Sequence, residues 1–492
     1  MIRYKSTRGG DESKRSTEAI IQGIAADKGL FVPETIPALP FKPEQKTATP
    51  YHYSAFHILK SFLPDFTDEE LKRCIEGAYD SRFEAAEIAP LVKAGSAYFL
   101  ELYHGRTAAF KDMALSILPY LLTTAMNKEK EEKKVVILTA TSGDTGKAAL
   151  EGFSDVPGTE IVVFYPKDGV SQVQERQMLT QSGKNTHVFA IRGNFDDAQA
   201  GVKKIFNDEA FAAKLAAKGY RLSSANSINI GRLAPQIVYY VYAYIKLLEL
   251  GAVETGAPMN VVIPTGNFGN ILAAYYAKRM GLPVRRLICA SNRNKILTDF
   301  IRTGVYDANR DFYVTNSPSM DILISSNLER LLYHLSGDSA GETAALMAKL
   351  EESRKYCVTG KIREGLKDFY GGFAGVEETN ETIGKLYQDE KYLVDTHTAV
   401  AYKVYEDYLK ETGDGTPAVI ASTASPYKFA DSVAKSIGLQ TDADEFENIR
   451  LLHEHTGVAV PDALKNLEGR EIRHSGVVDV GGMADAVSGS LE

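Results

Sequence analysis

Apolar runs of strand length alternate with helical patterns through the first half of the chain. Such runs occupy residues 134–142, 160–166 and 186–193, and helical patterns follow them at 147–153, from near residue 171, and after residue 193. β-branched runs of this length that end in small polar loops are typical of strands buried on both faces of a sheet. Their alternation with helices predicts right-handed βαβ units around a parallel sheet.

The same pattern starts again near residue 260. An apolar run that leads into a loop rich in glycine and asparagine covers 260–270, and a helical pattern covers 271–280. Further apolar runs cover 284–291 and 418–426. A chain of 492 residues is also too long for one ordinary core. We therefore predict an α/β fold with two lobes around parallel sheets, at residues 93–235 and 236–492.

Residues 1–92 do not follow this alternation. They combine short helical patterns with a zone of turns marked by Pro33, Pro37, Pro40 and Pro43. Prolines at this density interrupt regular elements. We expect this stretch to form an extra N-terminal unit.

Composition narrows the class of protein. The chain is 44% hydrophobic and 24% charged, with a net charge of −8 and both signs scattered, which argues against a nucleic-acid surface. Apolar stretches such as 114–122 are far shorter than the roughly 20 residues that span a bilayer, and the N-terminus lacks the apolar core of a signal peptide. Three distant cysteines suit a reducing compartment. We expect a cytoplasmic protein without membrane contact.

One lysine stands in apolar surroundings. Lys111 lies between Phe110 and Met113, after two alanines and next to Asp112. An exposed lysine at the start of an amphipathic helix fits this pattern. A buried lysine fits it too, and its lowered pKa would leave a neutral amine that can form a Schiff base.

A loop of small residues follows the apolar run that ends near residue 140. Ser142, Gly143, Asp144 and Thr145 offer hydroxyls and backbone amides at the start of a helix, where an anion is favoured. An ordinary strand-to-helix turn is the alternative. A nucleotide-binding P-loop is disfavoured, because Thr141 and Ala148 occupy positions where that motif needs glycine and a hydroxyl residue.

A second loop of this kind spans 264–270, again between a strand and a helix. Its two glycines and two asparagines suit a bound phosphate, although a simple turn with asparagine in left-handed conformation is also possible. Two further residues are candidates. Arg232 could clamp a phosphate or carboxylate, or lie at the surface. Thr423 follows an apolar strand and could equally be a helix cap. The histidines show no metal-ligand spacing, so we expect no catalytic metal.

Taken together these stretches resemble the threonine synthase family, in its fungal and bacterial branch with a long N-terminal unit. The shared blocks begin at 6–9 and 29–33 and continue at 104–112, 141–146, 226–229 and 266–270, and they end at 422–424. The resemblance implies the fold-type-II architecture of pyridoxal-phosphate enzymes, which is related to that of the tryptophan synthase β subunit. It also implies conversion of O-phosphohomoserine and water into threonine and phosphate.

The resemblance assigns residue roles block by block. Lys111 would be the Schiff-base lysine, and Thr423 would hydrogen-bond the pyridine nitrogen. The cofactor phosphate would be held by Gly266, Asn267, Phe268, Gly269 and Asn270. The substrate would be held by Ser142, Gly143, Asp144, Thr145, Arg232 and Lys147. Lys147 departs from the family, which usually has a small residue there, and Arg106 stands where proline is frequent.

Two other outcomes remain open from the sequence. A phospholyase of the same family would eliminate phosphate and release an α-keto acid without adding water. A protein of a different class, a P-loop-type nucleotide binder, is disfavoured by the loop register described above. The sequence leaves open whether the chain is a monomer or a dimer.

Overall fold

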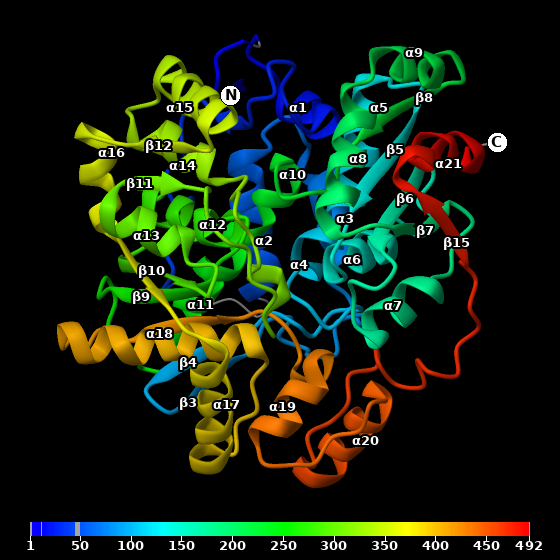
Figure 1. Ribbon diagram of the computed structural model, residues 1–492. Coiled ribbons are helices and arrows are strands. Elements are labelled where there is room, and N and C mark those ends of the chain that lie inside the picture. Colours follow the sequence, from blue (N-terminus) through cyan, green and yellow to red (C-terminus); the bar gives the residue numbers. More distant parts are fainter. Residues whose placement is uncertain (1, 11, 45–49, 492) are drawn as a thin grey trace.

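The computed structural model describes residues 2–10, 12–44 and 50–491, and Figure 1 shows helices around two sheets. The first sheet has five parallel strands in the order β15-β7-β6-β5-β8. Its strands are β5 (Lys134–Ala140), β6 (Thr159–Pro166), β7 (Thr186–Arg192), β8 (Tyr220–Ser223) and β15 (Gly476–Asp479). The helices that follow β5 to β7 are α6 (Asp144–Phe153), α7 (Gln172–Leu179), α8 (Phe195–Asn207) and α9 (Glu209–Ala217). This sheet forms the first lobe.

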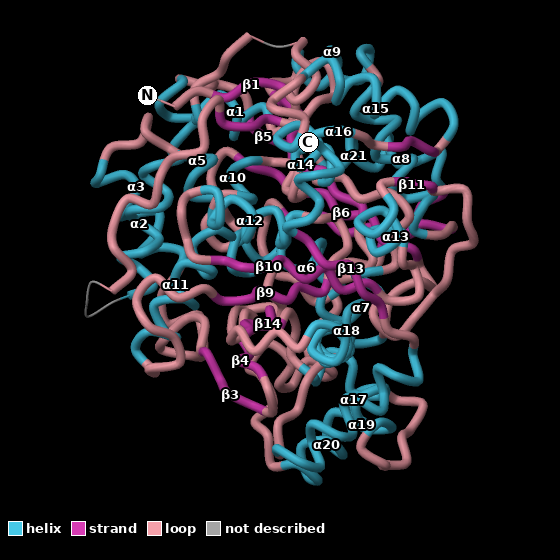
Figure 2. Tube along the Cα trace, turned by 90° about the vertical axis from the view of Figure 1, so that its left-hand side faces the viewer, coloured by secondary structure: helices cyan, strands magenta, loops and turns pink. Residues whose placement is uncertain are grey.

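The second sheet has six strands in the order β13-β10-β9-β14-β4-β3, and only β3 runs antiparallel to its neighbour. Figure 2 shows four of these strands, β10, β9, β14 and β4, one below another. The strands are β3 (Leu91–Ala94), β4 (Ala97–Glu101), β9 (Met259–Pro264), β10 (Val284–Ser291), β13 (Phe369–Phe373) and β14 (Ala418–Ser422). Two-stranded ribbons are made by β1 (Tyr4–Ser6) with β2 (Phe31–Pro33) and by β11 (Val305–Asp307) with β12 (Lys355–Cys357).

Helices of the second lobe surround this sheet. They are α11 (Pro235–Glu249), α12 (Gly269–Arg279), α13 (Ile296–Thr303), α14 (Leu328–Leu335), α15 (Ala340–Ser353), α16 (Gly360–Gly365), α17 (Val376–Glu390) and α18 (Thr396–Thr412). The chain then continues through α19 (Ala430–Ser436), α20 (Glu445–Thr456) and α21 (Met483–Ser490). Short 3-10 helices are η1 (Pro318–Met320), η2 (Leu366–Asp368), η3 (Pro426–Phe429) and η4 (Val480–Gly482).

The N-terminal helices α1 (Ser16–Gln22), α2 (Pro50–Phe62) and α3 (Asp68–Ala78) share a hydrophobic core with the lobes. The rings of Tyr51 and Tyr242 meet edge to face at 5.3 Å, which joins α2 to α11. Tyr79, at the end of α3, donates a hydrogen bond of 2.6 Å to the carbonyl of Met113 in α4 (Asp112–Leu115). The N-terminal stretch therefore supports the helix that follows Lys111.

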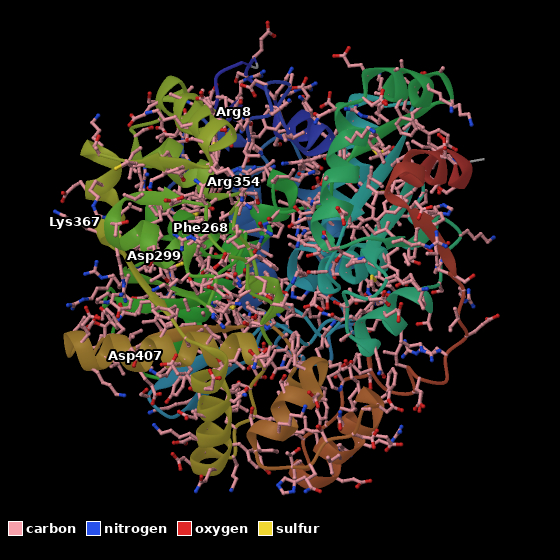
Figure 3. All side chains as sticks on the ribbon, viewed as in Figure 1. Arg8, Phe268, Asp299, Arg354, Lys367 and Asp407 are labelled. Carbon is pink, nitrogen blue, oxygen red and sulfur yellow. The ribbon has the colours of Figure 1, made fainter. Side chains whose placement is uncertain are left out.

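The predicted strands and helices around the candidate loops are confirmed, with small differences at helix starts. β10 has the predicted bounds, whereas α6 begins at Asp144 and α12 at Gly269, slightly before the apolar pattern starts. The first turn of a helix is polar where its amides are left free, so an apolar pattern misses it. Figure 3 shows Phe268, just before α12, in the second lobe; this side chain is buried, whereas Lys367 lies exposed at the edge.

The sheets do not follow consecutive stretches of chain. β4, within the predicted first lobe, pairs with β14 of the second sheet, and β15, near the C-terminus, pairs with β7 of the first. The predicted boundaries at residues 92 and 235 stay predictions. Through strand pairing, however, one segment of each predicted lobe joins the sheet of the other lobe. None of the helices within the described ranges has both the length and the apolar character needed to cross a membrane.

Candidate active site

Lys111 lies buried where the two lobes meet. It precedes α4, with only 8% of its surface exposed, and its ammonium lies 4.9 Å from the centre of the Phe110 ring. The preceding residues run beside the segment after β14, because Phe110 donates a 2.8 Å hydrogen bond to the carbonyl of Thr423. Of the two interpretations left open for this lysine, the buried one holds, and the chain places Lys111 next to the Thr423 segment.

The surroundings of Lys111 favour its neutral amine. Burial lowers its pKa below the ordinary value, and the nearby cations Arg232 and Lys428 lower it further. Asp144 opposes this shift, since its Oδ2 lies 3.7 Å from the Lys111 Nζ. The net pKa is lowered, which is the condition for a lysine that attacks a carbonyl carbon.

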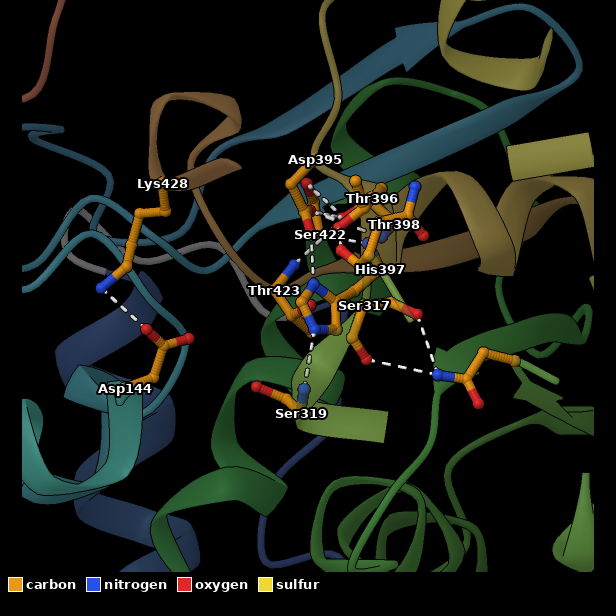
Figure 4. A network of polar contacts seen from close by, with 12 residues as sticks. Asp144, Ser317, Ser319, Asp395, Thr396, His397, Thr398, Ser422, Thr423 and Lys428 are labelled. Carbon is orange, nitrogen blue, oxygen red and sulfur yellow. Dashed lines mark hydrogen bonds and ion pairs between the residues drawn. The ribbon is translucent and has the colours of Figure 1, made fainter. Parts of the chain in front are cut away.

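Asp144 joins Lys111 to a second buried lysine that sequence reasoning missed. Figure 4 shows Lys428 of η3 pointing at Asp144, with 2.8 Å between Nζ and Oδ1. The Lys428 ammonium also donates to the Oε1 of Gln177 at 2.8 Å and to the carbonyl of Thr107 at 3.2 Å. Burial raises the pKa of Asp144, but Lys428 and Lys111 outweigh it and hold the carboxyl below its usual range. The one signal in the sequence that could have pointed to this residue is its place in the block 421–429, five residues after Thr423.

The loop before α6 leaves two backbone amides free. The Thr141 Oγ1 accepts from the N–H groups of Gly143 and Gly146, at 3.0 and 2.9 Å. Gly143 has φ 130°, and a Cβ there would lie 2.4 Å from the Gln174 side chain, so glycine is required. In the described part of the chain, the N–H groups of Asp144 and Thr145 meet no acceptor. Orphan amides at a helix N-terminus are an anion-binding arrangement.

Lys147 lies on the next turn of α6 and is already paired. Its ammonium donates to Glu151 at 3.1 Å and also to the Oε1 of Gln181. It lines a cavity of about 610 Å³ together with Arg106 and Gln177, and Lys111 does not line this cavity. In a P-loop this lysine would reach back to the phosphate-binding amides. Its pairing with Glu151 is a further argument against that alternative.

The loop before α12 has its carbonyls tied down and its amides free. The carbonyl of Gly266 accepts from the Ser325 Oγ at 2.7 Å, and that of Asn267 accepts from the N–H of Asn327 at 3.1 Å. Among the described residues, the N–H groups of Gly266, Asn267 and Phe268 have no acceptor. Phe268 adopts a left-handed conformation, with φ 64°, which turns the chain into the helix.

Asn270 supplies a further unpartnered donor beside this loop. Its Oδ1 accepts from the Tyr240 hydroxyl, but its buried Nδ2 has no partner. A buried amide without a partner costs free energy unless a ligand satisfies it. Gly266 has no room for a side chain, because a Cβ there would lie 2.4 Å from the carbonyl oxygen of Ser319. These residues fit a phosphate group held by backbone amides at a helix N-terminus.

Arg232 and Thr423 are both buried, and both keep polar groups unused. The Arg232 Nη1 donates to the carbonyl of Ala225 at 2.6 Å, and no carboxylate in the described ranges pairs with this guanidinium. Burial lowers its pKa to about 10, which still leaves a cation. The Thr423 hydroxyl makes no hydrogen bond within the described chain. Ser425, and not Thr423, caps η3, so the interpretation of Thr423 as that helix cap is wrong.

No group of three or more His, Cys, Asp and Glu side chains within residues 2–10, 12–44 and 50–491 could hold a metal ion. The candidate residues are instead the buried Lys111, two loops with free amides and one arginine without a carboxylate partner. Such a set could bind an anionic ligand and offer an amine to its carbonyl carbon. The expectation of a metal-free site stays a prediction.

Comparison with known proteins defines the class and then the family. A family model described as "Pyridoxal-phosphate dependent enzyme" matches residues 83–424, which include Lys111 and both anion loops. The chain is therefore an α/β pyridoxal-phosphate-dependent enzyme of fold type II. Models described as "Threonine synthase N terminus" and "Threonine synthase, C-terminal" match residues 3–79 and 398–487. The chain belongs to the threonine synthase family.

Individual relatives agree with this assignment. Threonine synthase of Pseudomonas aeruginosa is 40% identical over 439 residues, which cover 88% of this chain and 90% of that protein. The crystal structure of pyridoxal-phosphate-bound threonine synthase from Brucella melitensis is 34% identical, with a TM-score of 0.87 over 100% of both chains. Threonine synthase-like 1 of Homo sapiens is 39% identical over 441 residues. That alignment covers 87% of this chain but only 58% of the human protein.

Proposed function

We propose that the chain is a threonine synthase, which converts O-phospho-L-homoserine and water into L-threonine and phosphate. The observation that carries the proposal is the position of Lys111. It is buried, its pKa is lowered by that burial, and it lies beside Asp144 at the start of α6, where two backbone amides are free. The second loop, at 266–270, supplies a separate set of free amides. The substrate and the cofactor each bring an anionic group, and two separate sets of free amides, one of them beside Lys111, match that demand.

The cofactor roles follow from the unused polar groups. Lys111 would link covalently to pyridoxal phosphate, and Gly266, Asn267, Phe268, Gly269 and Asn270 would hold its phosphate. The free hydroxyl of Thr423 would hydrogen-bond the ring nitrogen. When bound, pyridoxal phosphate supplies an electron sink for carbanions formed next to the substrate amine.

The substrate roles use the first loop and the unpaired arginine. Ser142, Gly143, Asp144 and Thr145 would surround the substrate carboxylate. The amides of Asp144 and Thr145 and the hydroxyls of Ser142 and Thr145 would donate to it, while the N–H of Gly143 already donates to Thr141. The guanidinium of Arg232 would hold the phosphate that departs, since no carboxylate competes for it. Lys147 is the weaker phosphate receptor, because Glu151 and Gln181 already occupy its ammonium.

Lys111 would also move protons during the reaction. Its amine, which lies beside Asp144, would remove and return protons at Cα, Cβ and Cγ of the substrate. Loss of a Cβ proton would expel phosphate from Cγ, a proton added to Cγ would make the methyl group, and water would add its hydroxyl at Cβ. A phospholyase that releases an α-keto acid would use the same residues up to the loss of phosphate.

Product analysis with O-phosphohomoserine tests the proposal. We expect threonine and phosphate in equal amounts, and a control reaction without substrate should yield neither. Phosphate accompanied by an α-keto acid, with no threonine, would identify the phospholyase instead.

Borohydride reduction and peptide mapping test the site. We expect the cofactor label on Lys111, and a label on another lysine would refute its role.

Arg232→Ala should raise the Michaelis constant for O-phosphohomoserine while cofactor content stays at the wild-type level. Arg232→Lys should recover little, because a point charge cannot reproduce the planar fork. Unchanged kinetics in Arg232→Ala would move the phosphate site elsewhere.

We also propose a cytoplasmic location, which the three free cysteines support because free thiols persist in a reducing compartment.

A further inference from the structure

One buried carboxylate is linked by hydrogen bonds to two features that the proposed function assigns to the cofactor, the 266–270 loop and Thr423. Asp395 is fully buried and caps the N-terminus of α18. Its Oδ1 accepts from the Nδ1 of His397 at 2.9 Å, and its Oδ2 accepts from the Thr398 hydroxyl. Figure 4 shows the three side chains gathered at the start of α18. The two oxygens of Asp395 therefore serve two different side chains.

The first connection leads to the 266–270 loop. Because the Nδ1 of His397 donates to Asp395, its Nε2 is free to accept the N–H of Ser319, at 3.2 Å. The carbonyl of Ser319 in turn packs against Gly266, so closely that a Cβ there would lie 2.4 Å from its oxygen. A displacement of His397 would therefore release the residue that supports the loop proposed to hold phosphate.

The second connection leads to Thr423. The Thr398 hydroxyl donates its only proton to Asp395, so its lone pairs face outward and accept the N–H of Thr423 at 3.3 Å. This bond holds the backbone of Thr423, from which the free hydroxyl extends. Both connections start at the carboxylate of Asp395. One ends at the 266–270 loop and the other at Thr423.

We infer that Asp395, His397 and Thr398 are positioning residues that fix the distance between the phosphate loop and Thr423. The cofactor's phosphate is joined by a short arm to the same rigid ring that carries the ring nitrogen, so the spacing of their two receptors matters for binding. The inference rests on the proposed roles of the 266–270 loop and Thr423. It adds that one buried carboxylate sets both.

Two single substitutions separate the connections. His397→Leu removes the acceptor for Ser319, so we expect a shifted phosphorus resonance of the bound cofactor and an unchanged visible absorption band. Thr398→Val keeps the side-chain shape but removes the hydroxyl, so we expect a shifted visible band and a wild-type phosphorus resonance. Each should weaken cofactor binding roughly three- to tenfold, the effect of one lost hydrogen bond.

Rescue and control variants complete the test. Thr398→Ser restores the hydroxyl and should restore the visible band, and Asp395→Asn should change both signals. Thr379→Val removes a buried helix hydroxyl that bonds only its own helix, and should change neither. Circular dichroism identifies the variants that fold. If Asp395→Asn does not fold, His397→Leu and Thr398→Val alone test the inference.

All spectra are recorded on the cofactor-loaded protein without substrate. Threonine formation by the wild-type protein tests the proposed function separately. Folded His397→Leu and Thr398→Val variants with wild-type spectra would overturn the inference. It would also be overturned if both variants changed both signals alike.

Discussion

At the scale of residues, Lys428 has no free donor left for a ligand. Its three protons are taken by Asp144, Gln177 and Thr107, so its role is to neutralise and orient Asp144 beside Lys111. Lys428→Met would leave the buried carboxylate of Asp144 with a hydrogen bond from Gln174 and with the more distant Lys111 as its remaining cation. We expect the free energy of unfolding to fall by about 3 kcal/mol, the cost of breaking a buried ion pair.

Urea unfolding measures this loss, and the double variant Lys428→Met, Asp144→Asn should recover part of it. Lys435→Met removes an exposed pair with Asp431 and serves as the control, with an expected change of about 0.5 kcal/mol. Equal losses in Lys428→Met and Lys435→Met would contradict the role of Lys428.

Asp112, next to Lys111, gives a pH-dependent prediction. Burial raises its pKa from 3.8 to about 6, against two hydrogen bonds from Thr107 that lower it. Between pH 3.8 and about pH 6 the Asp112 carboxyl of the folded chain keeps a proton that the same carboxyl has released in the unfolded chain. The free energy of unfolding therefore falls as pH rises through this window. Asp112→Asn lacks the titrating group and should gain roughly 2–3 kcal/mol relative to wild type between pH 3.8 and pH 7.

Urea unfolding of both proteins across this pH range checks the difference. Parallel stability curves for wild type and Asp112→Asn would contradict the raised pKa.

Single residues were predictable where the chemistry is local. Lys111 stands out through its apolar neighbours, and the glycines of both loops through their place between strand and helix. The pairing of Lys428 with Asp144 was not predictable, because the two residues come from different lobes. The same holds for His397, whose partner Ser319 lies on a distant loop.

At the scale of elements, the start of α12 depends on small residues. A Cβ at Gly266 would lie 2.4 Å from a backbone oxygen, whereas one at Gly269 would lie 3.1 Å from the Ser227 Cβ. Gly266→Ala must therefore displace the loop, and we expect at least a tenfold loss of cofactor affinity. Gly269→Ala needs a shift of only a few tenths of an ångström and should cost less.

Equilibrium titration with pyridoxal phosphate measures both affinities. Gly341→Ala, which meets no neighbouring atom, is the matched control and should bind as the wild type does. If Gly269→Ala lost more affinity than Gly266→Ala, the close contact with Ser319 would not govern the loop.

Strands and helices of the two lobes were predictable because each carries its own periodicity. The segment 315–321 was not, because its conformation depends on bonds from Asn292 and Asn294 to Asp321 and not on an apolar pattern. Its place against Gly266 follows only from the folded chain.

At the scale of the whole molecule, strand order is the feature that sequence reasoning could not supply. Parallel pairing joins strands that are distant along the chain, as β14 with β4 and β7 with β15. The pattern predicted two α/β lobes, and the folded chain joins them by exchanging these strands. The catalytic proposal depends on that union. Lys111 lies next to the segment that follows β14 of the second sheet, and also 3.7 Å from Asp144, the first residue of α6 in the first lobe.

The most direct test of the central claim follows the oxygen atoms of the reaction. The protein is incubated with O-phosphohomoserine in water enriched in the heavy oxygen isotope, and both products are analysed by mass spectrometry. Elimination breaks the bond between Cγ and oxygen, and water then adds at Cβ. We therefore predict labelled threonine and unlabelled phosphate. Labelled phosphate with homoserine, or an α-keto acid without threonine, would contradict the account.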